Sequence, residues 1–229
     1  MRLRSIFLVI LMIFSLPLVV HAQGELATDA NAAVKVAEAR KVNAALMHHY
    51  NWTSRTEIID NGQIKDTRIE LVQYAPDGQL QRSLLNDQSA PLPRGFLRRA
   101  MAEDERKKMA KYLEGLQGLL EQYTLPTTGK ILDFIVAARL TGPDASGSYS
   151  MTGNNVVIPG DSLTIWTDLL TRHVRRIQVN TTFQGDPVQL TATFSTLPSG
   201  LNHVAYAEAT VPAKQLSVQI QNFNYNRFD

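Results

Sequence analysis

Residues 162–225 decide the fold of this protein. They contain five short segments: SLTIWTD at Ser162–Asp168, VRRIQVNTTF at Val174–Phe183, VQLTATF at Val188–Phe194, HVAYAEATV at His203–Val211 and QLSVQIQNF at Gln215–Phe223. Most of them alternate apolar and polar residues, which is typical of β-strands. Short turns such as QGDP and LPSG separate them. Because connections this short cannot make a parallel crossover, the stretch predicts a meander of four or five antiparallel strands.

The apolar residues of these segments gather on one face of the predicted sheet. Three sets are expected to share a face within their strand: Ile177, Val179, Thr181 and Phe183; Val188, Leu190, Ala192 and Phe194; Leu216, Val218 and Ile220. The residues between the members of the last set are Ser217 and Gln219, which are polar. One side of the sheet should therefore face an apolar partner and the other side water.

Composition and charge exclude several classes of protein. The 229 residues are 44% hydrophobic and 19% charged, which is typical of a globular chain and not of a disordered one. There is no cysteine, which excludes disulfides, thiolate metal sites and cysteine nucleophiles. Without residues 1–22, which contain Arg2 and Arg4, the Lys+Arg count falls from 23 to 21 and equals the 21 Asp+Glu. A chain without net charge gives no electrostatic reason to expect nucleic acid or an anionic membrane as partner.

Residues 1–22 have the three parts of a secretory signal peptide. MRLR is a basic start, Ile6–Val20 is almost entirely apolar, and Val20-His21-Ala22 offers small residues to a signal peptidase. The apolar run, about 15 residues, is shorter than the about 20 that span a bilayer. We therefore expect cleavage near Ala22, a periplasmic or secreted protein, and a single α+β domain over residues 23–229 without a transmembrane segment.

A helix and three more strands are predicted upstream of the meander. Glu25–Tyr50 has a helix-favouring composition and an apolar stripe at three- and four-residue steps. Trp52–Asp60 and Gln63–Tyr74 form a hairpin around Asn61-Gly62, a dipeptide that favours a type I′ turn. Leu80–Leu85 follows as a third strand.

Two helices are predicted between the two groups of strands. Phe96–Tyr123 is amphipathic, and its many charges indicate a solvated face. Gly129–Leu140 is apolar on most sides, so it should be buried or cover an apolar cavity. Tyr149–Met151 adds a strand edge. The predicted fold class is α+β, a curved antiparallel sheet that forms an open half-barrel of about eight or more strands covered by helices.

No motif in the sequence indicates an enzyme. The five histidines lack the spacing of metal ligands, and His48 and His49, being adjacent, point in different directions on a helix. A G-x-S-x-G elbow and a glycine-rich phosphate loop are both missing from the sequence. We therefore predict a protein that is not an enzyme, with no catalytic residues, no metal site and no cofactor. A hydrolase whose catalytic residues converge from distant positions is the alternative.

The order of the predicted elements resembles the LolA/LolB-like superfamily of periplasmic lipoprotein carriers and their outer-membrane receptors. The matching pieces are Trp52-Thr53-Ser54-Arg55-Thr56-Glu57 at the first hairpin, the turn Tyr74-Ala75-Pro76-Asp77-Gly78, and the late strands around Ile165-Trp166. The resemblance covers roughly Val34–Phe223 and is one of pattern. It implies a curved sheet that holds acyl chains against helices acting as a lid. Without a lipobox cysteine, the chain resembles the soluble carriers more than the anchored receptors.

The resemblance implies a ligand site on the sheet. The candidate lining residues are Trp52, Leu71, Trp166, Ile177, Val179, Leu190, Phe194 and Tyr206, and Arg55 is a candidate latch between sheet and helices. The ligand would be the acyl chains of a lipid or lipoprotein. Two interpretations of the apolar face stay open, an ordinary core filled by the helices and a cavity for a guest. An envelope interaction module with a protein partner and no small ligand is the alternative function.

Overall fold

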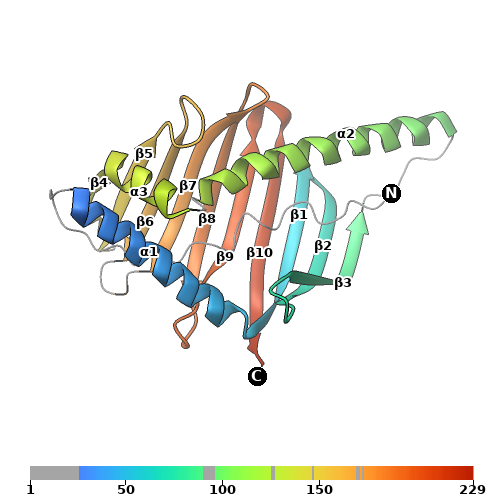
Figure 1. Cartoon of the computed structure of the whole chain (residues 1–229). Coiled ribbons are helices and arrows are strands. Elements are labelled where there is room, and N and C mark those ends of the chain that lie inside the picture. Colours follow the sequence, from blue (N-terminus) through green and yellow to red (C-terminus); the bar gives the residue numbers. More distant parts are fainter. Residues whose placement is uncertain are drawn as a thin grey trace.

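The computed structural model describes residues 26–89, 96–124, 127–145, 147–168, 171 and 173–228. The predicted signal peptide, residues 1–22, and the start of the first predicted helix at Glu25 lie outside the described residues. The described chain contains one ten-stranded sheet and three α-helices (Figure 1).

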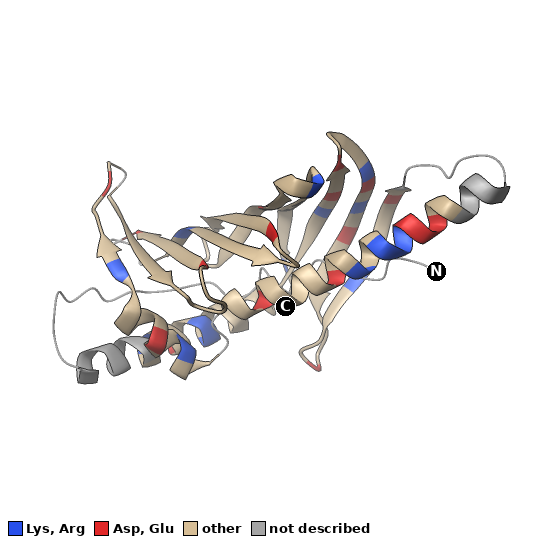
Figure 2. Ribbon diagram, turned by 90° about the horizontal axis from the view of Figure 1, so that it is seen from above, with Lys and Arg blue, Asp and Glu red and all other residues tan. Residues whose placement is uncertain are grey.

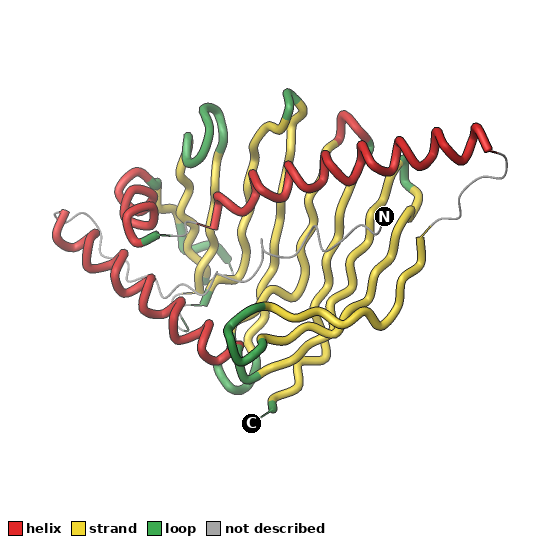
Figure 3. Tube along the Cα trace, turned by 45° about the vertical axis from the view of Figure 1, so that its right-hand side comes forward, coloured by secondary structure: helices red, strands yellow, loops and turns green. Residues whose placement is uncertain are grey.

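All neighbouring strands of the sheet run antiparallel. The strands are β1 (Tyr50–Asp60), β2 (Gln63–Tyr74), β3 (Leu80–Ser89), β4 (Arg139–Thr141), β5 (Ser148–Asn154), β6 (Ser162–Asp168), β7 (Val174–Phe183), β8 (Asp186–Thr196), β9 (Asn202–Val211) and β10 (Leu216–Arg227). Their spatial order is β3-β2-β1-β10-β9-β8-β7-β6-β5-β4, so the sheet is open, with β3 and β4 at its edges. The sheet is bent (Figure 3), and the predicted curved half-barrel is confirmed.

Pairing of β1 with β10 joins the two groups of strands into one sheet. Ile58 lies opposite Val218, and Arg55 lies opposite Gln221. The hairpin of β1 and β2 turns at Asn61-Gly62, where both residues have positive φ (52° and 72°), as the type I′ prediction requires. The prediction that the first three strands continue the C-terminal meander is therefore confirmed.

The three helices lie on the concave side of the sheet (Figures 1 and 3). They are α1 (Leu26–Met47), α2 (Phe96–Glu121), which ends in the 3₁₀ turn Gln122–Thr124, and α3 (Thr128–Ala137). α3 begins where the Oγ1 of Thr127 accepts a hydrogen bond from the main-chain N–H of Lys130, which is a normal N-cap. The half of α2 that bears most of its charges points away from α3 (Figure 2).

Two predicted helix ends are wrong. Tyr50 was expected in the first helix, but α1 ends at Met47 and Tyr50 begins β1, where its buried side chain packs with Trp52. Leu140 was expected in the third helix, but the chain turns extended at Ala138 and Leu140 pairs with Met151 in the short strand β4. In both cases sheet pairing prevails over local helical propensity.

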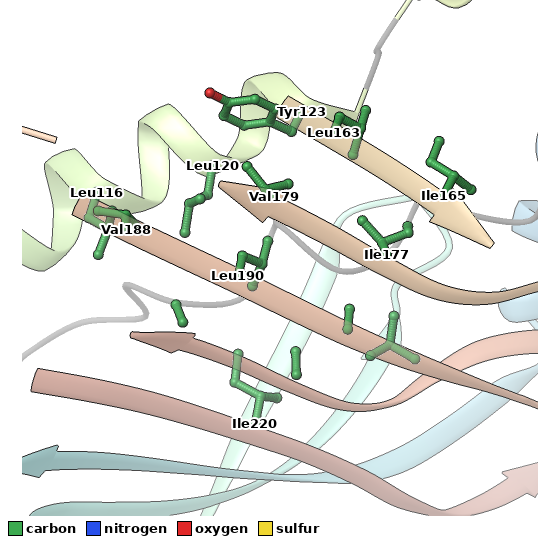
Figure 4. Packing of buried hydrophobic residues seen from close by; sticks show 14 of the residues in the cluster. Leu116, Leu120, Tyr123, Leu163, Ile165, Ile177, Val179, Val188, Leu190 and Ile220 are labelled. Carbon is green, nitrogen blue, oxygen red and sulfur yellow. The ribbon is translucent and has the colours of Figure 1, made fainter. Parts of the chain in front are cut away.

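The main hydrophobic core lies between the helices and the concave side of β5–β10. Alternate residues of the strands point into it, and α2 contributes Leu116, Leu120 and Tyr123 (Figure 4). Ile177 and Val179 on β7 are 2% and 0% exposed, as the alternation predicts. A second cluster forms beside β1 and β2 from Met47, Tyr50, Trp52, Val72 and Leu201.

The two glycines of α2 provide a test of how tightly that helix sits on the sheet. A Cβ atom at Gly115 would lie 2.7 Å from Cζ of Phe183, whereas a Cβ at Gly118 would meet no atom within 4 Å. We expect Gly118→Ala to raise the free energy of unfolding by about 0.8–1.0 kcal/mol, the helix-propensity gain. The free energy of unfolding of Gly115→Ala should be about 1–3 kcal/mol lower than that of Gly118→Ala, because the Phe183 ring must move to admit the Cβ atom. Urea denaturation of both variants measures this, and equal effects would show that α2 is loosely held.

Candidate ligand-binding face

Cross-strand rows of side chains run the full width of the concave side. One row consists of Ile165, Ile177, Ala192, Ala207 and Ile220 on β6–β10, then Thr56, Arg68 and Asp87 on β1–β3. The next consists of Leu163, Val179, Leu190, Ala209 and Val218, then Ile58 and Asp66. In both rows every residue from β6–β10 is apolar, and charges begin at β2. Figure 2 shows charged residues concentrated on the strands beside the first half of α2.

The apolar part of the concave side is covered by the helices. Leu113, Leu116 and Leu120 of α2 are 0–1% exposed and belong to the same cluster as Val179 and Leu190. Ile131 and Phe134 of α3 and Val36 of α1 complete the cover. In this structure the apolar face is therefore filled by the protein's own side chains.

Tyr123 ties the end of α2 to the sheet through a buried polar cluster. Its Oη lies 2.7 Å from Oδ2 of Asp161 and 2.6 Å from Oγ1 of Thr181. Because a phenol carries one proton, Tyr123 donates to the carboxylate and accepts from Thr181. Burial and the Asp161 carboxylate both raise the pKa of Tyr123, which keeps the phenol protonated.

Asp161 also fixes the loop between β5 and β6. Its carboxylate accepts hydrogen bonds from the main-chain N–H groups of Val156, Val157 and Ile158 at 2.6–2.8 Å. Burial by itself raises the pKa of Asp161, but these bonds and the one from Tyr123 outweigh it and lower the pKa. Protein donors thus hold this buried carboxylate in its charged form.

A second polar link ties α1 to the start of β9. Nδ2 of Asn43 donates to the main-chain oxygen of Asn202, and the Asn202 N–H donates to Oδ1 of Asn43, both at 2.9 Å. Asn43 is 8% exposed and Asn202 2% exposed. The amide of Asn43 therefore replaces a strand partner for Asn202 and positions α1 across the ends of the strands.

Charges on the concave side of β2 and β3 form a partly buried network. Glu70, 6% exposed, accepts a hydrogen bond from Arg82 at 2.5 Å, and Nη1 of Arg68 lies 3.9 Å from the same carboxylate. Burial lowers the pKa of Arg82 to about 10, although Glu70 acts in the opposite direction. Ser54 lies opposite Glu70 on β1 and is 1% exposed.

Aromatic rings enclose the second cluster at the end of β1 and β2. Trp52 stacks on Tyr225 with ring centroids 5.7 Å apart, and Tyr74 stacks on His48 at 4.2 Å. The ring of His203 also contacts Tyr225, with centroids 4.0 Å apart. Burial lowers the pKa of His203, so this ring is neutral near pH 7. The cluster stabilises the end of the sheet where α1 meets β1.

The structure brings together half of the predicted lining residues. Ile177, Val179 and Leu190 lie in the main core, and Phe194 packs against it. Trp52 lies in the second cluster, 1% exposed.

The other predicted residues point to the convex side. Leu71 lies opposite Thr53 and Ser83, Trp166 lies opposite Arg176, whose guanidinium stacks 4.9 Å from its ring, and Tyr206 contacts Glu208. Arg55, the candidate latch, pairs with Glu57 on that side and is 44% exposed. The links between helices and sheet are made instead by Tyr123 and Asn43.

The described residues give no sign of a metal centre, since they contain no group of three or more His, Asp or Glu side chains that could hold an ion. Among the described helices, none combines the length and apolarity needed to cross a membrane.

Comparisons with solved structures give distant likenesses, two of which follow. No family model matches the chain, and a search of curated proteins finds no match. A DUF1329 family protein from Desulfovibrio piger is 11% identical, with 90% of this chain and 94% of that one aligned at a TM-score of 0.39. A LolA superfamily protein from Nitrosomonas europaea is 8% identical, with 80% and 87% aligned at a TM-score of 0.36. The second belongs to the superfamily that the sequence pattern resembles.

Removing the Tyr123 hydroxyl should loosen α2. We expect Tyr123→Phe to lower the free energy of unfolding by about 1.5–3 kcal/mol, because it deletes a hydrogen bond to a charged group and leaves Thr181 without its acceptor. Tyr112→Phe is the matched control on the same helix, since the Tyr112 hydroxyl is buried without a hydrogen-bond partner among the described residues. That variant should be as stable as the wild type or more stable, because it removes a buried hydroxyl that makes no hydrogen bond among the described residues. Urea denaturation measures both, and a similar cost for the two would contradict the anchoring role.

Proposed function

We propose that this protein is an exported carrier that binds the acyl chains of a lipid or lipoprotein between the concave side of β6–β10 and the helices. The observation that carries the proposal is the pair of rows that stay apolar across five successive strands under a cover of separate helices. A cover of helices can move off a sheet without breaking strand pairing. The apolar face would then be open to a ligand.

The energetics favour a chain-like ligand. Transfer from water to this face would contribute about 0.8 kcal/mol for each buried CH₂ group, so a chain of about ten to sixteen carbons supplies about 8–13 kcal/mol before the costs of binding. Part of that energy must separate the helices from the sheet, because the face is closed in this structure. Affinity should therefore rise steeply with chain length.

Export supports the same proposal. The signal-peptide pattern of residues 1–22 would send a single domain, residues 23–229, to the periplasm or exterior. A lipid that crosses an aqueous compartment needs its chains shielded from water, and a non-enzymatic carrier meets that need. The alternative of an envelope module with a protein partner stays a prediction, and it expects no saturable binding of a lipid probe.

A substitution that preserves shape tests the face directly. We expect Val179→Thr, which places a hydroxyl on the concave side, to weaken binding of a fluorescent long-chain fatty acid about five- to thirtyfold, since an apolar contact loses about 1–2 kcal/mol. Thr191→Val is the matched control, because Thr191 lies on the neighbouring strand opposite Glu208, on the convex side. Fluorescence titration at a temperature where both variants are folded measures the affinities. No saturable binding, or equal affinities for both variants, would overturn the proposal.

Loosening the helical cover should strengthen binding of the probe. If the guest binds an open form, its apparent dissociation constant is the intrinsic one divided by the open fraction. Tyr123→Phe weakens the closed form, so we expect a less stable protein that binds the probe up to about tenfold more tightly and associates faster. Stopped-flow mixing with the same probe measures the rate, and Tyr112→Phe should leave it unchanged. Weaker or slower binding by Tyr123→Phe would show that α2 does not act as the lid.

A further inference from the structure

A row of polar atoms without hydrogen-bond partners crosses the concave side next to the apolar face. Ser54 on β1 is 1% exposed, and its Oγ has no hydrogen-bond partner among the described residues. Asn222 on β10 lies directly opposite Ser54. Its Nδ2 donates to the main-chain oxygen of Val204 at 3.1 Å, but its buried Oδ1 accepts no hydrogen bond within the described chain. A buried polar atom without a hydrogen-bond partner lowers the stability of the fold by about 1–3 kcal/mol. Two such atoms side by side therefore need an explanation.

A third such atom lies on the other side of Ser54. Glu70 is opposite Ser54 on β2, and Arg82 of β3 donates to its carboxylate through Nη1. The second nitrogen of that guanidinium, Nη2, is buried without a hydrogen-bond partner in the part of the chain that the structure describes. The Arg82 side chain is 9% exposed. The guanidinium nitrogen, the hydroxyl and the amide oxygen thus come from β3, β1 and β10, and the Glu70 carboxylate on β2 connects the first two.

These three polar atoms lie where the apolar face ends. Asn222 donates to the main-chain oxygen of Val204, which lies opposite Phe194 and is 3% exposed, so Asn222 lies beside the apolar face. Beyond Asn222 the row continues as Ser54 and Glu70. A ligand whose chain lies on β6–β10 would therefore have its head at this boundary.

We propose that Ser54, Asn222 and Arg82 form a head-group subsite for an uncharged, hydroxylated ester such as a monoacylglycerol. The proposal rests on the carrier function proposed above and names its ligand class. Ser54 Oγ and Arg82 Nη2 donate to an ester or hydroxyl oxygen of the head, and Asn222 Oδ1 accepts from a head-group hydroxyl.

The chemistry of the three atoms selects this head group over others. A hydrocarbon or a methyl ester has no donor for Asn222. A carboxylate could accept from Arg82, but it has no donor for the Asn222 oxygen and would lie beside the Glu70 carboxylate. A head group with hydroxyls satisfies all three atoms at once. A site that must hydrogen-bond its ligand discriminates strongly against analogues that lack the matching group.

Competition among ligands with the same chain tests the subsite. Monooleoylglycerol, oleic acid and methyl oleate would each displace the fluorescent fatty acid from the wild-type protein, followed by fluorescence. We expect monooleoylglycerol to displace the probe at a concentration about tenfold lower than methyl oleate, the equivalent of one or two buried hydrogen bonds. Ser54→Ala should bring that ratio toward one, while its unfolding midpoint stays equal to the wild type or rises. Ser83→Ala, on the convex side of β3, should keep the full ratio.

The outcomes separate this inference from the carrier function. If the probe and all three lipids fail to bind, both proposals fall. If they bind with equal affinity, or if Ser54→Ala leaves the ratio unchanged, the carrier function stands and the subsite is overturned, with the polar atoms serving ordered water only. A preference for oleic acid would overturn the uncharged head group.

Discussion

The pairing of β1 with β10 is the interaction on which the rest of the structure depends. It brings together strands from the two ends of the described chain, and it fixes which side chains lie beside one another across the sheet. Because strand side chains alternate with a period of two, a shift of one residue would move every apolar residue of β10 to the convex side. The register Ile58–Val218 therefore aligns the apolar rows of β6–β10 with the polar ends on β1–β3.

That alignment divides one curved surface into two chemical regions. α2 and α3 lie between β3 and β4 in the sequence, so the segment that joins the two edge strands supplies most of the cover of the concave side, and α1 supplies the rest. Over β6–β10 the cover is apolar and nearly complete, and its polar anchors are few and specific: Tyr123 on Asp161, and Asn43 on Asn202. Over β2 and β3 the rows carry charges, and an apolar cover would leave those charges unsolvated. The helices are therefore held to the sheet by polar contacts at particular side chains, such as Tyr123 and Asn43.

Alternation made the strands and most of the core predictable from the sequence. Ile177, Val179 and Leu190 follow an unbroken period of two, and each lies where that period places it. Leu71 was selected because it is apolar, yet its neighbours Glu70 and Val72 occupy the concave phase, since ion pairs with Arg82 and Arg68 allow a carboxylate there. Register shifts add to the difficulty, as at Thr193/Phe194, where an extra residue on β9 resets the phase. The anchors could not be predicted locally, because Tyr123 and Asp161 lie 38 residues apart and Asn43 and Asn202 lie 159 apart.

Buried polar groups explain why the concave side is not simply a larger core. Replacing Ser54 and Asn222 by apolar residues of similar shape would remove atoms that cost free energy and would extend the apolar rows onto β1. The chain instead keeps a hydroxyl, an amide oxygen and a guanidinium nitrogen at that boundary, next to a carboxylate that already has its own partners. Most buried polar groups in native proteins have a hydrogen-bond partner, and an ordered water or a bound ligand can supply one here. Under the proposed function, the apolar rows would supply affinity for any acyl chain, and the polar atoms beside them would limit which head groups fit.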